Sequence, residues 1–134
     1  MSEEATLVII KPDAVRRGLV GEILSRFERK GLRIEEMRLQ RIDRDLADRH
    51  YDEHREKAFF GELVDFITSG EVVVARVAGE QAVSVVRTLM GPTDPAAAPP
   101  GTIRGDYGVV ITENLVHGSD SPESAKRELD LFFG

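Results

Sequence analysis

The pattern of apolar and polar positions predicts three long strands. Thr6–Ile10 is a continuous apolar run rich in β-branched residues, which is typical of a strand buried on both faces. Val72–Val77 has the same character and is interrupted only by Arg76. Segment 32–42 instead alternates imperfectly between apolar and charged residues, and this predicts a strand with one exposed face.

Apolar residues at helical spacing lie between these strands. One stripe with the spacing i, i+3, i+4 and i+7 predicts a helix that ends near Gly31, and it consists of Val20, Ile23, Leu24 and Phe27. Further helices are expected after an N-cap at Asp43, over about 59–69, from about 79 to 90 and over about 122–132.

The order of these elements predicts the fold class. Segment 91–113 begins rich in Pro, Gly and Ala and is expected to be a long loop, although Tyr107–Thr112 has strand propensity. Leu115–Gly118 adds a short apolar piece before the last helix. The resulting βαββαβ order predicts one α+β domain over 1–134, with a four-stranded antiparallel sheet and helices packed on one face.

The amino-acid composition excludes several classes of function. The 134 residues are 41% hydrophobic and 31% charged, as in an ordinary globular protein, and the absence of cysteine excludes disulfides and thiolate chemistry. A net charge of −6 argues against a nucleic-acid partner. The acidic N-terminus does not resemble a signal peptide, and no apolar run has membrane-spanning length. A cytoplasmic protein with no membrane partner is expected.

The stretch Asn114–Ser121 is the candidate for the chemistry. It places His117 at a predicted strand end, just before a helix for which Ser121 suits the N-cap and Pro122 the first position. A helix N-terminus favours anions, so a phosphate would fit there. A lone histidine beside apolar residues is nevertheless more often structural, and the sequence around His117 leaves both interpretations open.

Three cations at loops or element ends could form a phosphate cradle: Lys11, Arg87 and Arg104. Each by itself is more often a solvated surface charge. A neutral imidazole can act as a nucleophile without first losing a proton, and a phosphorylated imidazole transfers its phosphate readily. Glu128 is a candidate to orient the histidine, against the alternative of an exposed helical charge.

Three segments carry a resemblance to a known family. TLVIIKPDAVRRGLV at 6–20, PGTIRGDY at 100–107 and NLVHGSDS at 114–121 closely resemble nucleoside diphosphate kinases of the bacterial type. The likeness covers practically the whole chain. It implies a ferredoxin-like fold and a reversible, ping-pong transfer of the γ-phosphate from ATP or another nucleoside triphosphate to nucleoside diphosphates, which maintains NTP and dNTP pools.

The resemblance also implies roles for individual residues. His117 would be the nucleophile, phosphorylated on its pros nitrogen, and Glu128 and Ser119 would hold it. The remaining positions would contact the nucleotide's phosphates, ribose or base: Lys11, Tyr51, Phe59, Leu63, Arg87, Thr93, Arg104, Ile111 and Asn114. Lys11 and Tyr51 would also serve catalysis. Mg²⁺ would accompany the nucleotide phosphates, with Asp120 reaching it through water. Finally, the resemblance assigns the fourth, central strand to Leu115–Gly118 and returns Tyr107–Thr112 to the loop.

A few positions depart from the family pattern. Ala14, Ala58 and Glu71 replace residues that are usually Gly or Pro, and these changes bear on loop rigidity. The chain also stops at Gly134, where many relatives continue into subunit contacts. A homo-oligomer is expected, with a hexamer favoured over a tetramer. The alternative function is a non-catalytic nucleotide-binding or regulatory module on the same fold.

Overall fold

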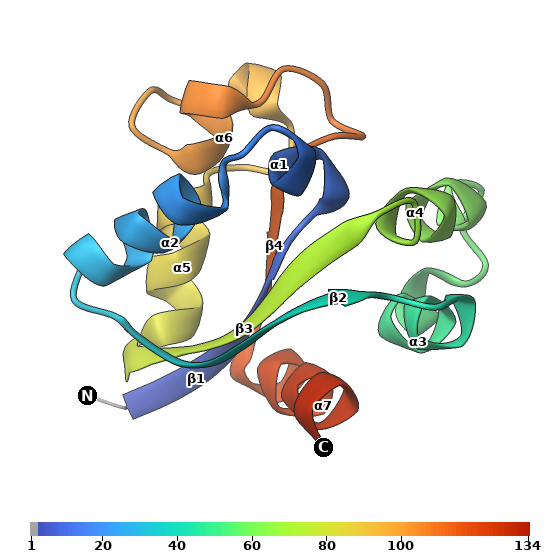
Figure 1. The fold of residues 1–134 in the computed structure, drawn as a ribbon, viewed down its shortest axis with the longest axis horizontal. Helices are drawn as coiled ribbons and strands as arrows, with labels where there is room; N and C mark the ends of the chain where they lie inside the picture. Colours follow the sequence, from blue (N-terminus) through green and yellow to red (C-terminus); the bar gives the residue numbers. More distant parts are fainter. Residues whose placement is uncertain (1–2) are drawn as a thin grey trace.

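The computed structural model describes residues 3–134 and follows the predicted alternation of elements (Figure 1). The strands are β1 (Glu3–Ile10), β2 (Arg33–Arg41), β3 (Glu71–Glu80) and β4 (Val116–Gly118). The helices are α1 (Pro12–Arg16), α2 (Val20–Arg29), α3 (Arg44–His50), α4 (Phe60–Ile67), α5 (Ala82–Met90), α6 (Ile103–Tyr107) and α7 (Pro122–Phe133). Two short 3-10 helices are η1 (Asp52–His54) and η2 (Pro95–Ala97).

The four strands form one antiparallel sheet in the order β2-β3-β1-β4. The α+β prediction and the four-stranded antiparallel sheet are therefore confirmed. The expectation that Leu115–Gly118 is the central strand is wrong, because β4 lies at the edge and pairs only with β1. β1 is the inner strand between β3 and β4, as its uninterrupted apolar run predicts.

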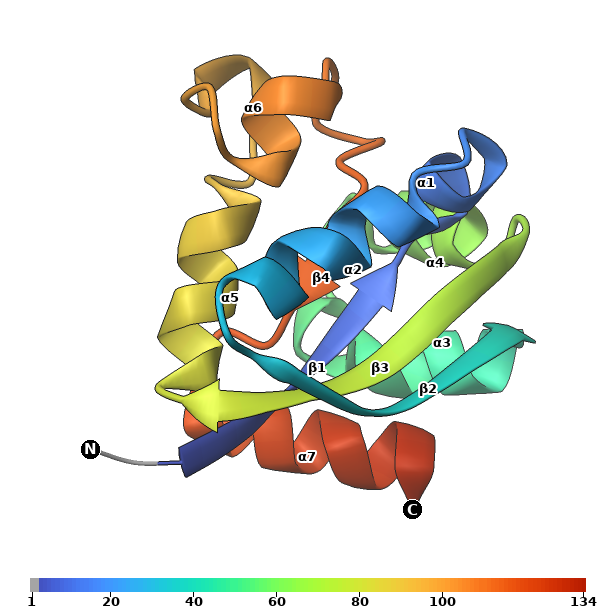
Figure 2. The ribbon, with the colours of Figure 1, turned by 60° about the vertical axis from the view of Figure 1, so that its left-hand side comes forward.

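Helices cover both faces of the sheet, so the prediction that they lie on one face is wrong. Figures 1 and 2 show α2 and α5 on one side and α7 on the other. Alternate residues of β1 enter two separate cores: Val8 and Ile10 pack with α2 and α5, while Leu7 and Ile9 pack with α4 and α7. The physical reason is that the apolar run Leu7–Ile10 of this inner strand places apolar side chains on both faces of the sheet, and both must be covered.

The second half of the chain contains two local corrections. Gly79 and Glu80 end β3 and do not begin a helix, because the chain turns at Gln81, whose φ is +52°, and α5 starts at Ala82. The loop over 91–113 is not without structure, since it contains η2 and α6. Residues 108–112 form no strand, in agreement with what the family resemblance implies. Among residues 3–134, no helix combines the length and the apolar character needed to cross a bilayer.

The predicted N-cap at Asp43 gives a first test of the fold. Its Oδ1 accepts a hydrogen bond of 2.8 Å from the Leu46 amide at the start of α3. We expect Asp43→Ala to lower the free energy of unfolding by about 1 kcal/mol, because one helix N–H loses its partner. Urea unfolding measures this change. Asp43→Asn is the control, since an amide oxygen can accept the same bond; an equal loss in both variants would contradict the capping role.

Candidate active site

Strand register decides which way the candidate nucleophile points. His117 is paired with Ile9 of β1, and residues directly opposite each other in an antiparallel pair share a face of the sheet. Ile9 belongs to the core that α7 covers. The side chain of His117 is therefore directed toward α7 and not toward α2 and α5.

Two polar side chains hold this imidazole. His117 Nε2 lies 2.9 Å from Glu128 Oε1, and the Ser119 hydroxyl donates to the same oxygen at 2.7 Å. Ser119 is itself fixed because its oxygen accepts a bond from the Leu7 amide of β1. The predicted grouping of these three residues thus exists in the structure, and Glu128 is a buried carboxylate and not an exposed helical charge.

The hydrogen bond to Glu128 fixes the tautomer of His117. Burial by itself would raise the pKa of Glu128, but the hydrogen bond and charge of His117 and the bond from Ser119 hold that pKa below its usual range. An ionised carboxylate only accepts, so Nε2 must carry the proton. Nδ1 then keeps its lone pair, and His117 retains a partly accessible side chain, 21% exposed.

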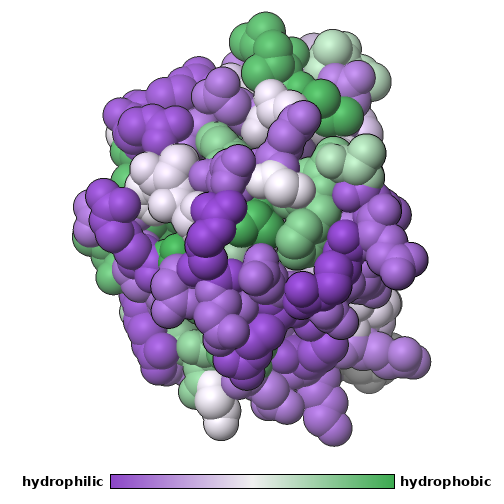
Figure 3. Space-filling view, turned by 90° about the vertical axis from the view of Figure 1, so that its right-hand side faces the viewer, coloured by the Kyte–Doolittle hydropathy of each residue, from purple (hydrophilic) through white to green (hydrophobic). Residues whose placement is uncertain are grey.

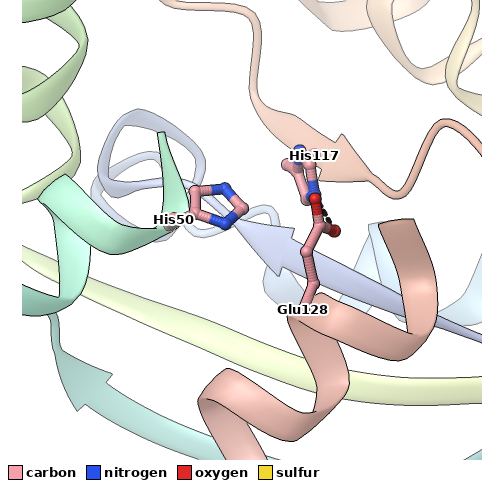
Figure 4. A group of neighbouring side chains, drawn as sticks. All are labelled: His50, His117 and Glu128. Carbon is pink, nitrogen blue, oxygen red and sulfur yellow. Dashed lines mark hydrogen bonds and ion pairs between the residues drawn. The ribbon is translucent and has the colours of Figure 1, made fainter. Parts of the chain in front are cut away.

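A second imidazole lies against the first. The His50 ring, on α3, meets the His117 ring edge-on with centroids 4.8 Å apart, and Figure 4 shows the two rings with Glu128 beside them. Burial, together with the charge of His117, lowers the pKa of His50 to about 3, so His50 is neutral near pH 7. Its buried Nδ1 has no hydrogen-bond partner in the part of the chain that the structure describes.

These three side chains also offer potential metal ligands, with ligand atoms within 4.8 Å of one another. A tetrahedral zinc ion with bonds of about 2.0–2.1 Å needs ligand atoms roughly 3.4 Å apart. His117 Nε2 and Glu128 Oε1 are closer than that, 2.9 Å apart, because they are hydrogen-bonded to each other, and the same oxygen also accepts from Ser119. Two nitrogen ligands do not suit Mg²⁺, which prefers oxygen. The cluster of His50, His117 and Glu128 is therefore poorly suited to bind Mg²⁺ directly, and these residues are more compatible with an ion that is bound by nucleotide phosphates.

A groove of about 820 Å³ lies between α4 and residues 111–114. Most of the residues expected to touch a nucleotide line it: Lys11, Tyr51, Phe59, Leu63, Thr93, Ile111 and Asn114. Phe59 and Ile111 are 44% and 54% exposed, so both present apolar surface to solvent. On the face that Figure 3 shows, hydrophobic side chains gather in the upper half, above a mostly hydrophilic lower half. An exposed aromatic in a groove is suited to stacking against a planar ring.

The inner end of the groove is polar. Lys11 Nζ donates to Asn114 Oδ1 at 2.9 Å, and Asn114 Nδ2 donates to the Thr93 carbonyl at 3.2 Å. The structure therefore brings together the lysine and asparagine that the resemblance assigns to the ribose. Burial and the neighbouring charge of Arg104 lower the pKa of Lys11 to about 8. Burial raises the pKa of Tyr51, which therefore remains a neutral hydroxyl.

The two arginines are placed differently. Arg104 is buried and donates to three backbone carbonyls, those of Gly91, Asn114 and Val116. Burial, with the charge of Arg87, lowers the pKa of Arg104 to about 10, so it remains cationic at neutral pH. Arg87, on α5, donates to the Gly118 carbonyl at 3.4 Å, next to His117.

Asp120 lies apart from the groove. It is exposed and lines a separate surface hollow with Arg87 and Ser121, near the N-terminus of α7. Ser121 caps α7 by accepting from the Ser124 amide, as its position before Pro122 predicts.

Sequence reasoning missed two buried polar residues beside the site, His50 and Asp13. His50 was visible only as one polar position of a short helix, and Asp13 as the residue after Lys-Pro. Asp13 is 3% exposed and accepts a bond from the Leu115 amide, 102 positions away in the sequence. No local pattern signals such a contact, because it depends on how β1 and β4 are joined.

Comparison with known proteins identifies the chain's relatives. The family model described as nucleoside diphosphate kinase matches residues 4–134. A nucleoside diphosphate kinase of Rubrobacter xylanophilus is 64% identical over 131 residues, covering 98% of each chain. One from Archaeoglobus fulgidus is 59% identical, covering 97% of this chain and 86% of the relative.

Solved structures give the same result. A halophilic nucleoside diphosphate kinase from Halobacterium salinarum in complex with CDP superposes with a TM-score of 0.96 at 50% identity, covering 98% of this chain and 88% of that one. The Aquifex aeolicus nucleoside diphosphate kinase superposes with a TM-score of 0.97 at 43% identity, covering 99% and 96%.

The fold and these relatives define a phosphotransferase that acts on nucleotides. More narrowly, the chain belongs to the nucleoside diphosphate kinase family, and its activity is the transfer of the γ-phosphate of a nucleoside triphosphate to a nucleoside diphosphate.

The depressed pKa of Lys11 predicts a pH dependence of this activity. Raising the pH through about 8 removes the ammonium charge in the free enzyme, so attraction for nucleotide phosphates falls. We expect kcat/KM to decline above pH 8 in the wild type, measured by coupled assay from pH 6 to 10. Lys11→Arg keeps its charge across this range and should lose the alkaline decline, although at a lower activity. An alkaline decline that is unchanged in Lys11→Arg would rule out Lys11 as its source.

Proposed function

We propose that the transfer proceeds in two steps through a phosphohistidine at His117, formed on Nδ1. The observation that carries this proposal is the 2.9 Å contact between His117 Nε2 and the buried Glu128 carboxylate. It leaves Nδ1 as the ring nitrogen with a free lone pair. Ser119 keeps the carboxylate in place and so preserves that orientation.

In the first step the Nδ1 lone pair attacks the γ-phosphorus of a nucleoside triphosphate. A P–N bond forms, the P–O bond to the β-phosphate breaks, and the nucleoside diphosphate leaves with the electron pair on its oxygen. The ring then carries substituents on both nitrogens and a positive charge, which the Glu128 carboxylate stabilises. In the second step another nucleoside diphosphate attacks the same phosphorus and restores neutral His117.

The groove residues would bind the nucleotide in this cycle. Lys11 and its hydrogen-bond partner Asn114 would contact a ribose hydroxyl and a phosphate, and Thr93 and Tyr51 line the same groove. Arg87 and Arg104 do not line the groove, but their charges lie close to each other and to Lys11 and would add to the attraction for the phosphates. Phe59, Leu63 and Ile111 would enclose the base through stacking and apolar contact, which every base can make.

Magnesium would enter the site bound to the nucleotide's phosphates, where it neutralises charge in the transition state. Asp120, which lies outside the groove in the hollow beside Arg87, would reach that ion through water. We further propose that 1–134 is one domain, that it works in the cytoplasm, and that it assembles as a homo-oligomer, a hexamer in preference to a tetramer. Exposed apolar residues on β2 and after α6 support self-association: Met37, Leu39, Val109 and Val110.

Brief incubation with γ-labelled ATP and Mg²⁺ tests the phosphohistidine. The chain should become labelled, and the label should be labile in acid, stable in base and discharged by GDP. His117→Ala should take up no label because Nδ1 is absent. A label that is stable in acid, or that persists in His117→Ala, would refute the mechanism, as would the absence of any label in the wild type.

Phe59→Ala tests base stacking. We expect the KM to rise for all nucleoside diphosphates by a similar factor, because stacking energy of about 1–3 kcal/mol per base does not depend on hydrogen-bonding edges. The measurement compares KM for ADP, GDP, CDP and UDP in wild type and variant. Loss confined to purines or to pyrimidines would show that Phe59 does not act by non-selective stacking.

A further inference from the structure

A strained turn lies between Asn114, which lines the groove, and the strand that carries His117. Leu115 stands between Asn114 and the strand that carries His117, and its φ is +74° although it is not glycine. The Val116 amide donates to the Asn114 carbonyl at 2.8 Å, which closes a three-residue turn around Leu115. A turn of this kind with a positive φ is rare and strained, and strain of this kind persists only when surrounding contacts hold it.

The turn is held on both sides by the segment that follows β1. The Leu115 amide donates to Asp13 Oδ2 at 3.2 Å, and the Leu115 carbonyl accepts from the Lys11 amide at 2.9 Å. The Asp13 contact is the only side-chain hydrogen bond to Leu115 among residues 3–134. The segment that follows β1 also includes Lys11, whose Nζ donates to Asn114.

Arg104 adds a second support from the opposite side. Its guanidinium donates to the carbonyls of Asn114 and Val116, the residues that flank Leu115. Asp13 and Arg104 therefore hold the same peptide group, the one that joins Asn114 to Leu115: Asp13 accepts from its N–H, and Arg104 donates to its C=O. The backbone N–H and C=O of Leu115 are both hydrogen-bonded within the protein, and the side chain of Leu115 is fully buried.

Asp13 is an unusual residue to find in this position. It is 3% exposed, and its other oxygen, Oδ1, is buried and has no hydrogen-bond partner within residues 3–134. Burial raises the pKa of Asp13, although the nearby backbone amides and the Lys11 charge partly offset this effect. A buried carboxylate with one unsatisfied oxygen costs stability, so its presence calls for a compensating role.

We propose that Asp13 is a positioning residue for phosphate transfer: by holding the Leu115 turn it sets the side chain of Asn114 toward Lys11 and the nucleotide and aligns the strand that presents His117. This inference rests on the proposed roles of Asn114 and His117. Asp13 is not among the residues that line the groove, so its effect would pass through the turn.

A double-mutant cycle between Asp13 and Asn114 tests this role in the full-length protein. The variants are Asp13→Ala, Asn114→Ala and the double mutant, each assayed for kcat/KM with GDP and with 2′,3′-dideoxy-GDP. Asp13→Ala should lower kcat/KM for GDP at least tenfold and reduce the preference for the nucleotide with a 3′-hydroxyl. The kcat/KM of the double mutant should be no more than about twofold below that of the less active single variant, because both changes disturb the same contact.

Asp13→Asn and Asp43→Ala are matched controls. An asparagine oxygen can still accept from the Leu115 amide, so Asp13→Asn should recover most of the lost activity and should serve as the test if Asp13→Ala does not fold. Asp43→Ala removes a carboxylate that also accepts one backbone amide, but at the far side of α3, and it should combine with Asn114→Ala additively.

The outcomes separate this inference from the proposed function. Additive effects of Asp13→Ala and Asn114→Ala, or an Asp13→Ala variant with wild-type kinetics and lowered stability only, would reduce Asp13 to a folding residue. An Asp13→Asn variant as impaired as Asp13→Ala would overturn the hydrogen-bonding role. Labelling of wild-type His117 is measured separately, so its failure would count against the phosphohistidine and not against the turn.

Discussion

The pairing of β4 with β1 is the constraint on which the site depends. Because His117 is opposite Ile9, it shares the face of the sheet that α7 covers, and this places its ring within hydrogen-bonding distance of Glu128. A shift of one residue in this register would turn His117 toward α2 and α5 and leave Glu128 without its partner. The chemistry of the imidazole therefore rests on backbone hydrogen bonds between two strands more than one hundred residues apart in the sequence.

The two buried cations of the site, Lys11 and Arg104, are held in place by hydrogen bonds to the protein. Arg104 satisfies backbone carbonyls around the turn before β4, and its guanidinium remains close enough to lower the pKa of Lys11. The ammonium group of Lys11 in turn donates a hydrogen bond to the side chain of Asn114. Lys11 and Arg104 repel each other, and these hydrogen bonds hold them close together before a nucleotide binds. Such preorganisation suits phosphoryl transfer, where the protein contributes mainly position and charge.

His50 shows how burial can shape a site without joining the reaction. The ring contacts His117, Tyr51 and Phe132, and it is neutral because burial disfavours its charged form. A neutral neighbour adds no positive charge beside the His117 ring. The same ring closes one side of His117 against α3, so the imidazole is confined between α3 and the Glu128 carboxylate of α7.

The sequence by itself determined the inner strand, the helical stripes and the caps at Asp43 and Ser121, because these depend on periodicity and on contacts within a few residues. It also singled out His117, Lys11 and Asn114 through motifs whose resemblance to one family is specific. The apolar run of the inner strand also required cover on both faces of the sheet, although helices were expected on one face only. The sequence could not place β4 at the edge or find the Asp13 contact with Leu115. Those features are decided by strand order and register, which long-range packing sets and no local pattern records.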